Sequence, residues 1–486
     1  MATMPSTPEP TTARTTTPAP APAPPKNRAP AWLVVALACA GQFLVVLDVS
    51  VVNVALPSMR ADLGLSAPGL QWVVNAYAIT FAGFLLLGGR AGDLYGRKRT
   101  FLIGLALFTL ASLSGGLAQS DWELLVARAV QGLGAAILAP STLTLLTAAV
   151  PEGAARARAI ATWTAVGAGG GSAGGLVGGV LVDTLSWRWV LLINVPVGAL
   201  VLAGALRWLP ETRTATRRRL DVPGAVLVTA GLATLAFGIS RIEAEGWTSG
   251  AALLPLGAGV VLIAAFLAVE ARAKSPLMPL GLLRLRQVAS ANVAMFISGS
   301  ATFCMWFFMT LYAQNVLGYT PLEAGLAQIP SSFAVIIGSK LAPRLMRTTS
   351  PRAVAVLGAL VAAGGFAWQS TMSADGELLT DIVLPGVLMM LGAGLATTPL
   401  ASLATSGAGA ADSGIVSGLV NTSRTMGGSL GLAVMATIAA TRTDGRTTAA
   451  ALTDGYALTF RTSAAVLTAG ALLMWAWLPR GGGDRA

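Results

Sequence analysis

A single carboxylate, that of Asp48, lies in the middle of an apolar stretch long enough to cross a membrane. A charge at that depth costs about 2.5 to 3.5 kcal/mol, so an acid there usually faces a cavity, has a charged partner or holds a proton. A carboxyl that water reaches from one side and then from the other can carry protons, and its anion attracts cations. Alternatively, Asp48 lies near an outer helix end and reaches the head groups, since Pro57 follows it closely. We favour the proton-carrying interpretation.

Two arginines within apolar stretches could act together with such an acid. Arg128 lies a few residues into the fourth stretch. Because a guanidinium keeps its proton, Arg128 can set the charge state of a neighbouring acid or hold a hydrogen-bonded network. The alternative is an anchor to lipid phosphate. Arg424 lies deeper in its stretch, with Asn421 and Thr422 nearby, and if it lines a cavity it disfavours cationic cargo there.

The composition is that of a polytopic membrane protein. Of 486 residues, 54% are hydrophobic and 11% are charged, whereas soluble domains carry about 25% charged residues. The sequence contains no histidine, which excludes Ser-His catalytic groups, histidine metal ligands and a histidine proton relay. Cys39 and Cys304 fall in separate apolar stretches and are expected to be packing groups, so we predict no disulfide, metal or cofactor.

The apolar stretches predict fourteen transmembrane helices, each near the roughly 20 residues that a bilayer requires. They begin near residues 32, 70, 100, 124, 159, 189, 222, 251, 288, 324, 353, 382, 414 and 457. If both termini are cytoplasmic, 24 of the 32 lysines and arginines fall in inside segments and 5 in outside loops, as the positive-inside rule predicts. The net charge of +11 is then a consequence of topology, not a nucleic-acid footprint.

The expected fold is an all-α membrane protein with two six-helix bundles and two additional central helices. We expect a disordered tail at 1–30, a first bundle at 31–210, two inserted helices with linkers at 211–287, a second bundle at 288–480 and a tail at 481–486. A faint repeat supports the two bundles, because Gly170–Gly174 is echoed by Gly427–Gly431 and the basic loop at 89–99 by residues 338–352. Two six-helix halves with a binding site between them are typical of transporters.

A compact charged loop runs between the second and third apolar stretches. Its glycines, Gly89 and Gly96, permit close backbone approach and a tight turn. Asp93 can pair with a guanidinium or cap the next helix, while Arg97 and Lys98 face the cytoplasm and the lipid head groups. Such a cluster can hold one closed state of a gate. The alternative is a basic loop that only sets the topology.

Glycines form two neighbouring rows along the fifth stretch. One row contains Gly167, Gly171, Gly175 and Gly179, and the other contains Gly170, Gly174 and Gly178. Faces without side chains let other helices approach very closely. The rows therefore predict close packing of the fifth helix against its neighbours, which by itself requires no further role.

A central cavity for a large apolar or cationic molecule would need aromatic and polar lining groups. Aromatic rings bind such molecules by stacking and by cation–π contact, although they also face lipid or anchor helices at the interface. The residues that we expect to line the cavity are Asn53, Trp72, Asn75, Tyr77, Gln131, Trp163, Phe307 and Arg424. Because the second half carries no deep acid, strict specificity for dications is not expected.

Four stretches together resemble the fourteen-helix drug:proton antiporters of the major facilitator superfamily, over roughly residues 31 to 480. They are Leu47–Pro57, Gly89–Lys98, Arg128–Gly134, and the glycine-rich fifth stretch with Trp187–Trp189 and Ile193–Pro196 after it. The resemblance implies that Asp48 and Arg128 couple transport to protons, that the charged loop is a cytoplasmic gate, and that the glycine rows mark an antiporter. The sequence departs from the family pattern at Ala91, Leu94 and Gly175.

The predicted protein is thus a monomeric exporter of lipophilic or cationic drugs or antibiotics in a bacterial cytoplasmic membrane. Its expected partners are the drug, protons and the bilayer. The alternative is a proton-coupled symporter that imports a nutrient, but the central stretches are mostly aliphatic and aromatic. A membrane-embedded transferase or hydrolase needs paired catalytic groups, which one deep acid and no histidine do not supply.

Overall fold

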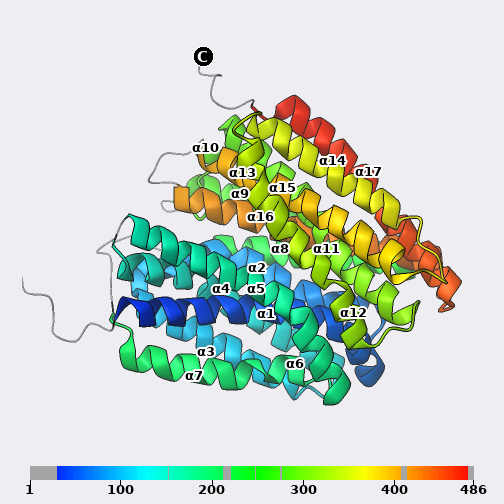
Figure 1. The fold of residues 1–486 in the computed structure, drawn as a ribbon, viewed down its shortest axis with the longest axis horizontal. Coiled ribbons are helices and arrows are strands. Elements are labelled where there is room, and N and C mark those ends of the chain that lie inside the picture. Colours follow the sequence, from blue (N-terminus) through cyan, green and yellow to red (C-terminus); the bar gives the residue numbers. More distant parts are fainter. Residues whose placement is uncertain are drawn as a thin grey trace, which may run out of the picture.

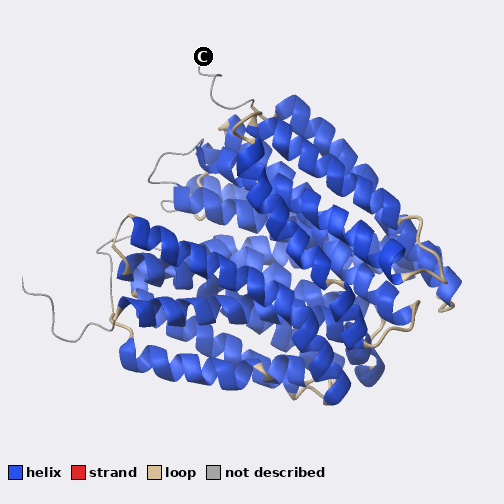
Figure 2. Cartoon of the chain, in the orientation of Figure 1, coloured by secondary structure: helices blue, strands red, loops and turns tan. Residues whose placement is uncertain are grey.

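The computed structural model describes residues 30–151, 153–211, 220–246, 248–273, 276–406 and 413–479. The regular structure within these ranges is entirely helical, as Figure 2 shows. The all-α prediction is therefore confirmed. The predicted tails at 1–29 and 481–486, and most of the linker after residue 211, lie outside the described residues.

The first half contains six membrane-length segments, the last of which is broken at Ile193. They are α1 (Ala31–Leu63), α2 (Ala67–Tyr95), α3 (Arg97–Gly116), α4 (Asp121–Ala149), α5 (Ala154–Thr184), and α6 (Trp189–Leu192) followed by α7 (Asn194–Trp208). Two further helices, α8 (Val222–Glu245) and α9 (Gly250–Arg272), pack against each other, and α8 also contacts α2 of the first half.

The second half follows a short helix, α10 (Leu280–Leu283). Its segments are α11 (Arg286–Asn315), α12 (Pro321–Ala327) with α13 (Ile329–Leu345), α14 (Pro351–Gln369), the π-turn η1 (Leu379–Val383) with α15 (Leu384–Ser406), α16 (Ser413–Thr443) and α17 (Ala449–Trp477). In Figure 1 these helices form one group and α1 to α7 form another, and α16 packs against α2 and α8 where the groups meet.

Thirteen of the described segments are both long enough and apolar enough to cross a membrane. The fourteenth predicted span corresponds to α16, whose 31 residues exceed the required length but include the polar group Asn421, Ser423 and Arg424. It is nevertheless packed among apolar helices, against α2, α11 and α17. The polar residues of α16 therefore lie on a helix that other helices of the protein surround.

The first helix extends further than its proline suggests. Pro57 lies inside α1, which continues to Leu63 and ends where Gly64 adopts the left-handed conformation at φ 64°. Asp48 is thus about 22 Å from the end of the helix, at 1.5 Å per residue. The alternative in which Asp48 reaches the head groups from an outer helix end is therefore wrong, because the helix continues past Pro57.

Candidate functional site

Asp48 is the centre of a buried polar network. Its Oδ2 accepts a hydrogen bond from Arg128 Nη1 of α4 at 2.6 Å, which is also an ion pair. Its Oδ1 accepts hydrogen bonds from Gln131 Nε2 at 2.7 Å and from Asn194 Nδ2 of α7 at 2.9 Å. The side chains of Asp48 and Arg128 are 0% and 2% exposed, so neither charge reaches solvent in this conformation.

Arg128 is held on several sides besides the carboxylate. Its Nε donates to the carbonyl oxygen of Val73 in α2 at 3.1 Å, and its Nη1 also donates to Gln131 Oε1 at 2.7 Å. The guanidinium carbon lies 4.4 Å from the centre of the Tyr77 ring, within the range of a cation–π contact. The arginine therefore stays positioned by α2 and α4 even when its contact with Asp48 changes.

Ser112 of α3 also belongs to the network, through hydrogen bonds with Gln131 and Asn194. Its Oγ accepts hydrogen bonds from Gln131 Nε2 at 2.9 Å and Asn194 Nδ2 at 3.0 Å, and donates to the carbonyl oxygen of Leu191 at 3.0 Å. Ser112 and Asn194 are both fully buried. Sequence reasoning noticed Asn194 only as part of a motif and gave no role to Ser112, because one polar residue in an apolar stretch carries no sign of its partners.

This geometry makes the charge of Asp48 a structural constraint. Removing one partner of a buried ion pair leaves an uncompensated charge, which typically costs 3–5 kcal/mol, about a third of a protein's net stability or more. A proton on Asp48 has the same consequence, because it neutralises the carboxylate and leaves Arg128 charged. Proton binding is therefore expected to rearrange α1 relative to α4, or to admit water to Arg128.

The other predicted cavity residues fall into different environments. Asn53 donates to Val49 O of its own helix at 2.8 Å, and Trp163 Nε1 donates to Thr142 Oγ1 at 3.0 Å. Asn75 is buried, with neither amide atom hydrogen-bonded among the described residues. Trp72 packs beside the apolar cluster that joins α2 to α16.

Three predicted cavity residues lie in protein interiors instead. Gln131 belongs to the Asp48 network and Tyr77 covers Arg128. Phe307 is 3% exposed and meets Phe308 edge-on at 5.1 Å, within a buried apolar cluster that contains residues of both halves. The rings of Tyr77 and Phe307 are packed in the protein interior, because aromatic side chains are suited to close packing as well as to the wall of a cavity. In this conformation they do not line an opening.

The predicted charged loop is helical on both sides of Gly96, since α2 continues to Tyr95 and α3 begins at Arg97, and this α2–α3 junction is tied to its own half. Gly96 has φ 104°, a conformation that side chains rarely adopt, and a Cβ there would strike the Glu211 carboxylate. Lys98 Nζ donates to the carbonyl oxygen of Leu206 at 2.9 Å, and Arg99 N donates to Glu211 Oε2 at 3.3 Å. Gly89 has only Pro140 within 4 Å of such a Cβ. The loop thus joins the α2–α3 turn to the end of α7, while the Asp93 side chain lies outside the described residues.

The glycine rows of α5 lie against two helices, α1 along most of their length and α12 at Gly175 and Gly179. One row lies against α1, where a Cβ on Gly174 would strike Ser50 and one on Gly178 would meet Val51, while Ser50 Oγ donates to Gly171 O at 2.8 Å. At the base of the rows, Gly167 lies beside Gln42. The row therefore fixes α5 to the helix that carries Asp48.

The other row reaches the second half of the molecule. A Cβ on Gly175 would lie 3.0 Å from the carbonyl oxygen of Gly325 in α12, and one on Gly179 would lie 2.5 Å from Leu322 Cα. Leu322 N donates to Asp183 Oδ2 at 3.2 Å. Gln314 of α11 donates to Val54 O of α1 at 2.8 Å on the same side of the molecule. The halves are thus held together at the face of the molecule that lies opposite the start of α1.

The second half repeats the helix contacts of the first. Each repeated contact brings a glycine of one helix against the backbone of its neighbour. The pairs are Gly104 with Leu138 and Gly134 with Phe108 in the first half, and Gly358 with Ala396 and Gly392 with Ala362 in the second. The register of these contacts places Phe366 where α3 has Ser112, and Met389 where α4 has Gln131.

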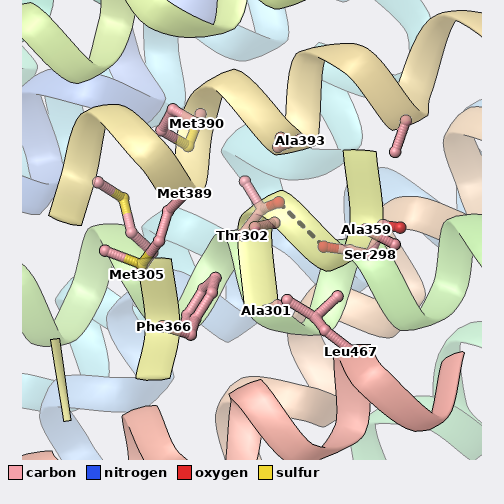
Figure 3. Close-up of a pocket in the computed structure, with 13 residues that line it drawn as sticks. Ser298, Ala301, Thr302, Met305, Ala359, Phe366, Met389, Met390, Ala393 and Leu467 are labelled. Carbon is pink, nitrogen blue, oxygen red and sulfur yellow. Dashed lines mark hydrogen bonds between the residues drawn. The ribbon is translucent and has the colours of Figure 1, made fainter. Parts of the chain in front are cut away.

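At the position that corresponds to the network, the second half is apolar. Figure 3 shows Met305, Phe366 and Met389 converging on a small pocket between α11, α14, α15 and α17. The space there for a water-sized group is about 10 Å³, at the lower limit for one water molecule. The only side-chain hydrogen bond drawn there runs from Thr302 to the backbone of Ser298, at 2.9 Å. The charged network is thus a feature of the first half alone among the described residues.

We expect that losing one charge of the buried ion pair destabilises the protein more than losing both charges together. Asp48→Asn should lower the thermal unfolding temperature in detergent, because it leaves Arg128 uncompensated. The double variant Asp48→Asn with Arg128→Gln should recover most of that loss. Asp62→Asn, which breaks an exposed pair with Arg188, is the matched control and should change stability by about 1 kcal/mol or less. A double variant no more stable than the single one would contradict the assignment.

We also expect the glycine rows to tolerate added volume only where space exists. Gly174→Val should destabilise the protein by about 1–3 kcal/mol, because its side chain would push α1 away from α5. Gly169→Val on the same helix is the control, since nothing lies within 4 Å of a Cβ at that position. Thermal unfolding of both variants measures the difference, and equal melting temperatures would mean that close α1–α5 packing is not needed.

Comparisons with known proteins agree with this architecture. A sequence model of the Major Facilitator Superfamily matches residues 38–432. The cephamycin export protein CmcT of Amycolatopsis lactamdurans is 49% identical over 84% of this chain and 85% of its own length. The puromycin resistance protein pur8 of Streptomyces alboniger is 37% identical over 91% and 90%. A crystal structure of a D-xylose-proton symporter, 14% identical, covers 94% of this chain and 99% of its own with a TM-score of 0.65, which concerns the fold alone. The chain therefore belongs to the major facilitator superfamily.

Proposed function

We propose that this protein exports amphipathic antibiotics across a cell membrane in exchange for protons, by alternating access between its two halves. The names of its relatives support export, because one is described as an export protein for cephamycin and another as a resistance protein for puromycin. The observation that carries the proton coupling is the ion pair of Asp48 and Arg128, fully buried at membrane depth.

The face from which α1 starts is proposed to be cytoplasmic. The basic loop of Lys98 and Arg99 lies at that face, where α2 ends and α3 begins. Basic residues in short loops remain on the cytoplasmic side during insertion. In this orientation the α5–α12 contacts close the outer face, and cargo enters from the cytoplasm or the inner leaflet.

The exchange cycle follows from the charge of Asp48. With the outer face open, a proton reaches the carboxylate and releases its ion pair with Arg128. The shift of α1 that follows passes to α5 through the close contact of Ser50 with Gly174, and from α5 to α12 through Gly175. The outer face then closes, and Asp48 releases its proton to the cytoplasm. The ion pair then re-forms, as it is in this structure with the outer face closed, and binding of cargo from the cytoplasm returns the protein to the outward-open state from which the cargo leaves.

The driving force is sufficient for export. One elementary charge crossing 100 mV yields about 2.3 kcal/mol, which supports roughly a fifty-fold gradient of a neutral solute per proton when coupling is complete. The network needs no second titrating group to use this energy. Asp48 alone can carry one proton per cycle, with Arg128 as its fixed counter-charge.

Drug-driven proton release from energised inverted vesicles tests the proposal. Wild-type protein should release protons when an exported antibiotic is added, because uptake into the vesicles consumes the proton gradient. Asp48→Asn should abolish this signal, while Asp48→Glu, which keeps a titratable group, should retain part of it. The vesicles must contain equal amounts of each variant.

Three outcomes would contradict the proposal. Equal proton release by wild type and Asp48→Asn would remove Asp48 from the coupling. Solute accumulation in right-side-out vesicles driven by an inward proton gradient would indicate a symporter. Covalent change of the added compound would indicate an enzyme.

A further inference from the structure

Arg424 is a deep cation without an acidic partner. It is the twelfth residue of α16, about 16 Å along the helix at 1.5 Å per residue. Its one hydrogen bond among the described residues runs from Nη2 to Asn421 Oδ1 at 3.1 Å, and no carboxylate of that part of the chain pairs with it. Arg128, the comparable arginine of the first half, is by contrast fully paired.

The Arg424 side chain opens onto space inside the molecule. The residue is exposed, although the helix that carries it packs against several others. Its backbone lies against Gly299 of α11, and the rest of α16 packs on α2, α8 and α17. Ser417 and Asn421, at positions i−7 and i−3, continue the same face of α16 as a polar stripe. A side chain that solvent reaches on a helix covered on so many sides lines an internal opening.

A second arginine shows how an outward-facing cation differs. Arg461 is the thirteenth residue of α17, is also exposed, and likewise has no ion pair among the described residues. However, α17 lies at the outer edge of the bundle in Figure 1, whereas α16 lies where the two halves meet. Arg461 can therefore reach lipid head groups by snorkelling, whereas Arg424 faces the protein interior.

No described carboxylate offsets the charge of Arg424. The other described carboxylates, Asp48 excepted, lie in loops or within the first or last two turns of helices. Asp48 itself is enclosed and neutralised by Arg128. An unpaired cation at membrane depth is costly, so it is retained where it meets an opposite charge during function. That charge has to arrive with the cargo.

Resting on the export function proposed above, we propose that Arg424 binds a carboxylate of the exported molecule, so that the preferred cargo is an amphipathic organic anion. The guanidinium presents a planar fork of donors that matches a carboxylate, and Asn421 holds that fork in place from the next turn of the helix. The apolar remainder of the cargo contacts the surrounding aliphatic and aromatic side chains. Such a cargo differs from the lipophilic or cationic cargo expected from the sequence, because it carries a negative charge.

Binding of a matched pair of probes tests the proposal. The probes are cefoxitin, which carries one carboxylate, and its methyl ester, which differs by the loss of that charge. Affinities are measured by calorimetry on full-length protein in nanodiscs of neutral phosphatidylcholine, so that no anionic lipid competes. The wild type should bind the acid about tenfold or more tightly than the ester, the difference expected of one charge-assisted hydrogen bond.

The variants assign that preference to one side chain. Arg424→Gln should remove the preference for the acid and leave the affinity for the ester unchanged, while Arg424→Lys should keep part of the preference. Arg461→Gln is the matched control, with the same charge change at similar depth, and should behave as wild type. Equal binding of acid and ester by wild type, or an unchanged preference in Arg424→Gln, would overturn the proposal. If the wild type loses its preference for the acid over the ester when anionic lipid is added, Arg424 binds a lipid head group and the proposal is overturned as well.

Proton release in the vesicle assay separates this inference from the export function. Exchange with a neutral or cationic antibiotic but not with cefoxitin would leave export standing and reject the role of Arg424. If no compound of any charge exchanges for protons, the export function itself fails.

Discussion

The structure depends on one electrostatic constraint, which is that the Asp48 and Arg128 charges at membrane depth must compensate each other. The carboxylate accepts three hydrogen bonds from two further helices, and the guanidinium is held by the Val73 carbonyl and the Tyr77 ring. A proton on Asp48 removes one half of the compensation and leaves the other half in place. In the proposed cycle the first bundle therefore has two arrangements of different charge, and the proton decides between them.

Close backbone packing would transmit the proposed movement of α1 to the rest of the molecule. The α1 helix carries Asp48 and also lies against a glycine row of α5, and the other glycine row of α5 lies against α12 of the second half. Because interlocked backbones cannot shift independently, a movement of α1 alters the seam between the halves. The second half offers an apolar methionine-rich interior in place of the network, so it follows the movement without titrating.

The sequence was sufficient to predict the all-α fold and the membrane-length helices. It also singled out Asp48 and Arg128, which the structure joins in an ion pair, because deep charges in apolar stretches are visible one residue at a time. It did not reveal Ser112 or Asn194 as partners, since these lie on separate helices and are joined only by packing. Phe307 was predicted to line a cavity but is buried, because a phenylalanine suits a cavity wall and a packed core equally well. Pro57 suggested a helix end, but the helix continues past it.

Infrared difference spectroscopy of the protein in lipid tests the central claim most directly, because it detects the carbonyl band of a protonated carboxyl group. The account predicts that lowering the pH across the range in which exchange occurs produces such a band in wild type, and that Asp48→Asn removes it. If Asp48 stays ionised throughout that range, with no band that the substitution removes, the Asp48–Arg128 pair is structural and the proton acts elsewhere.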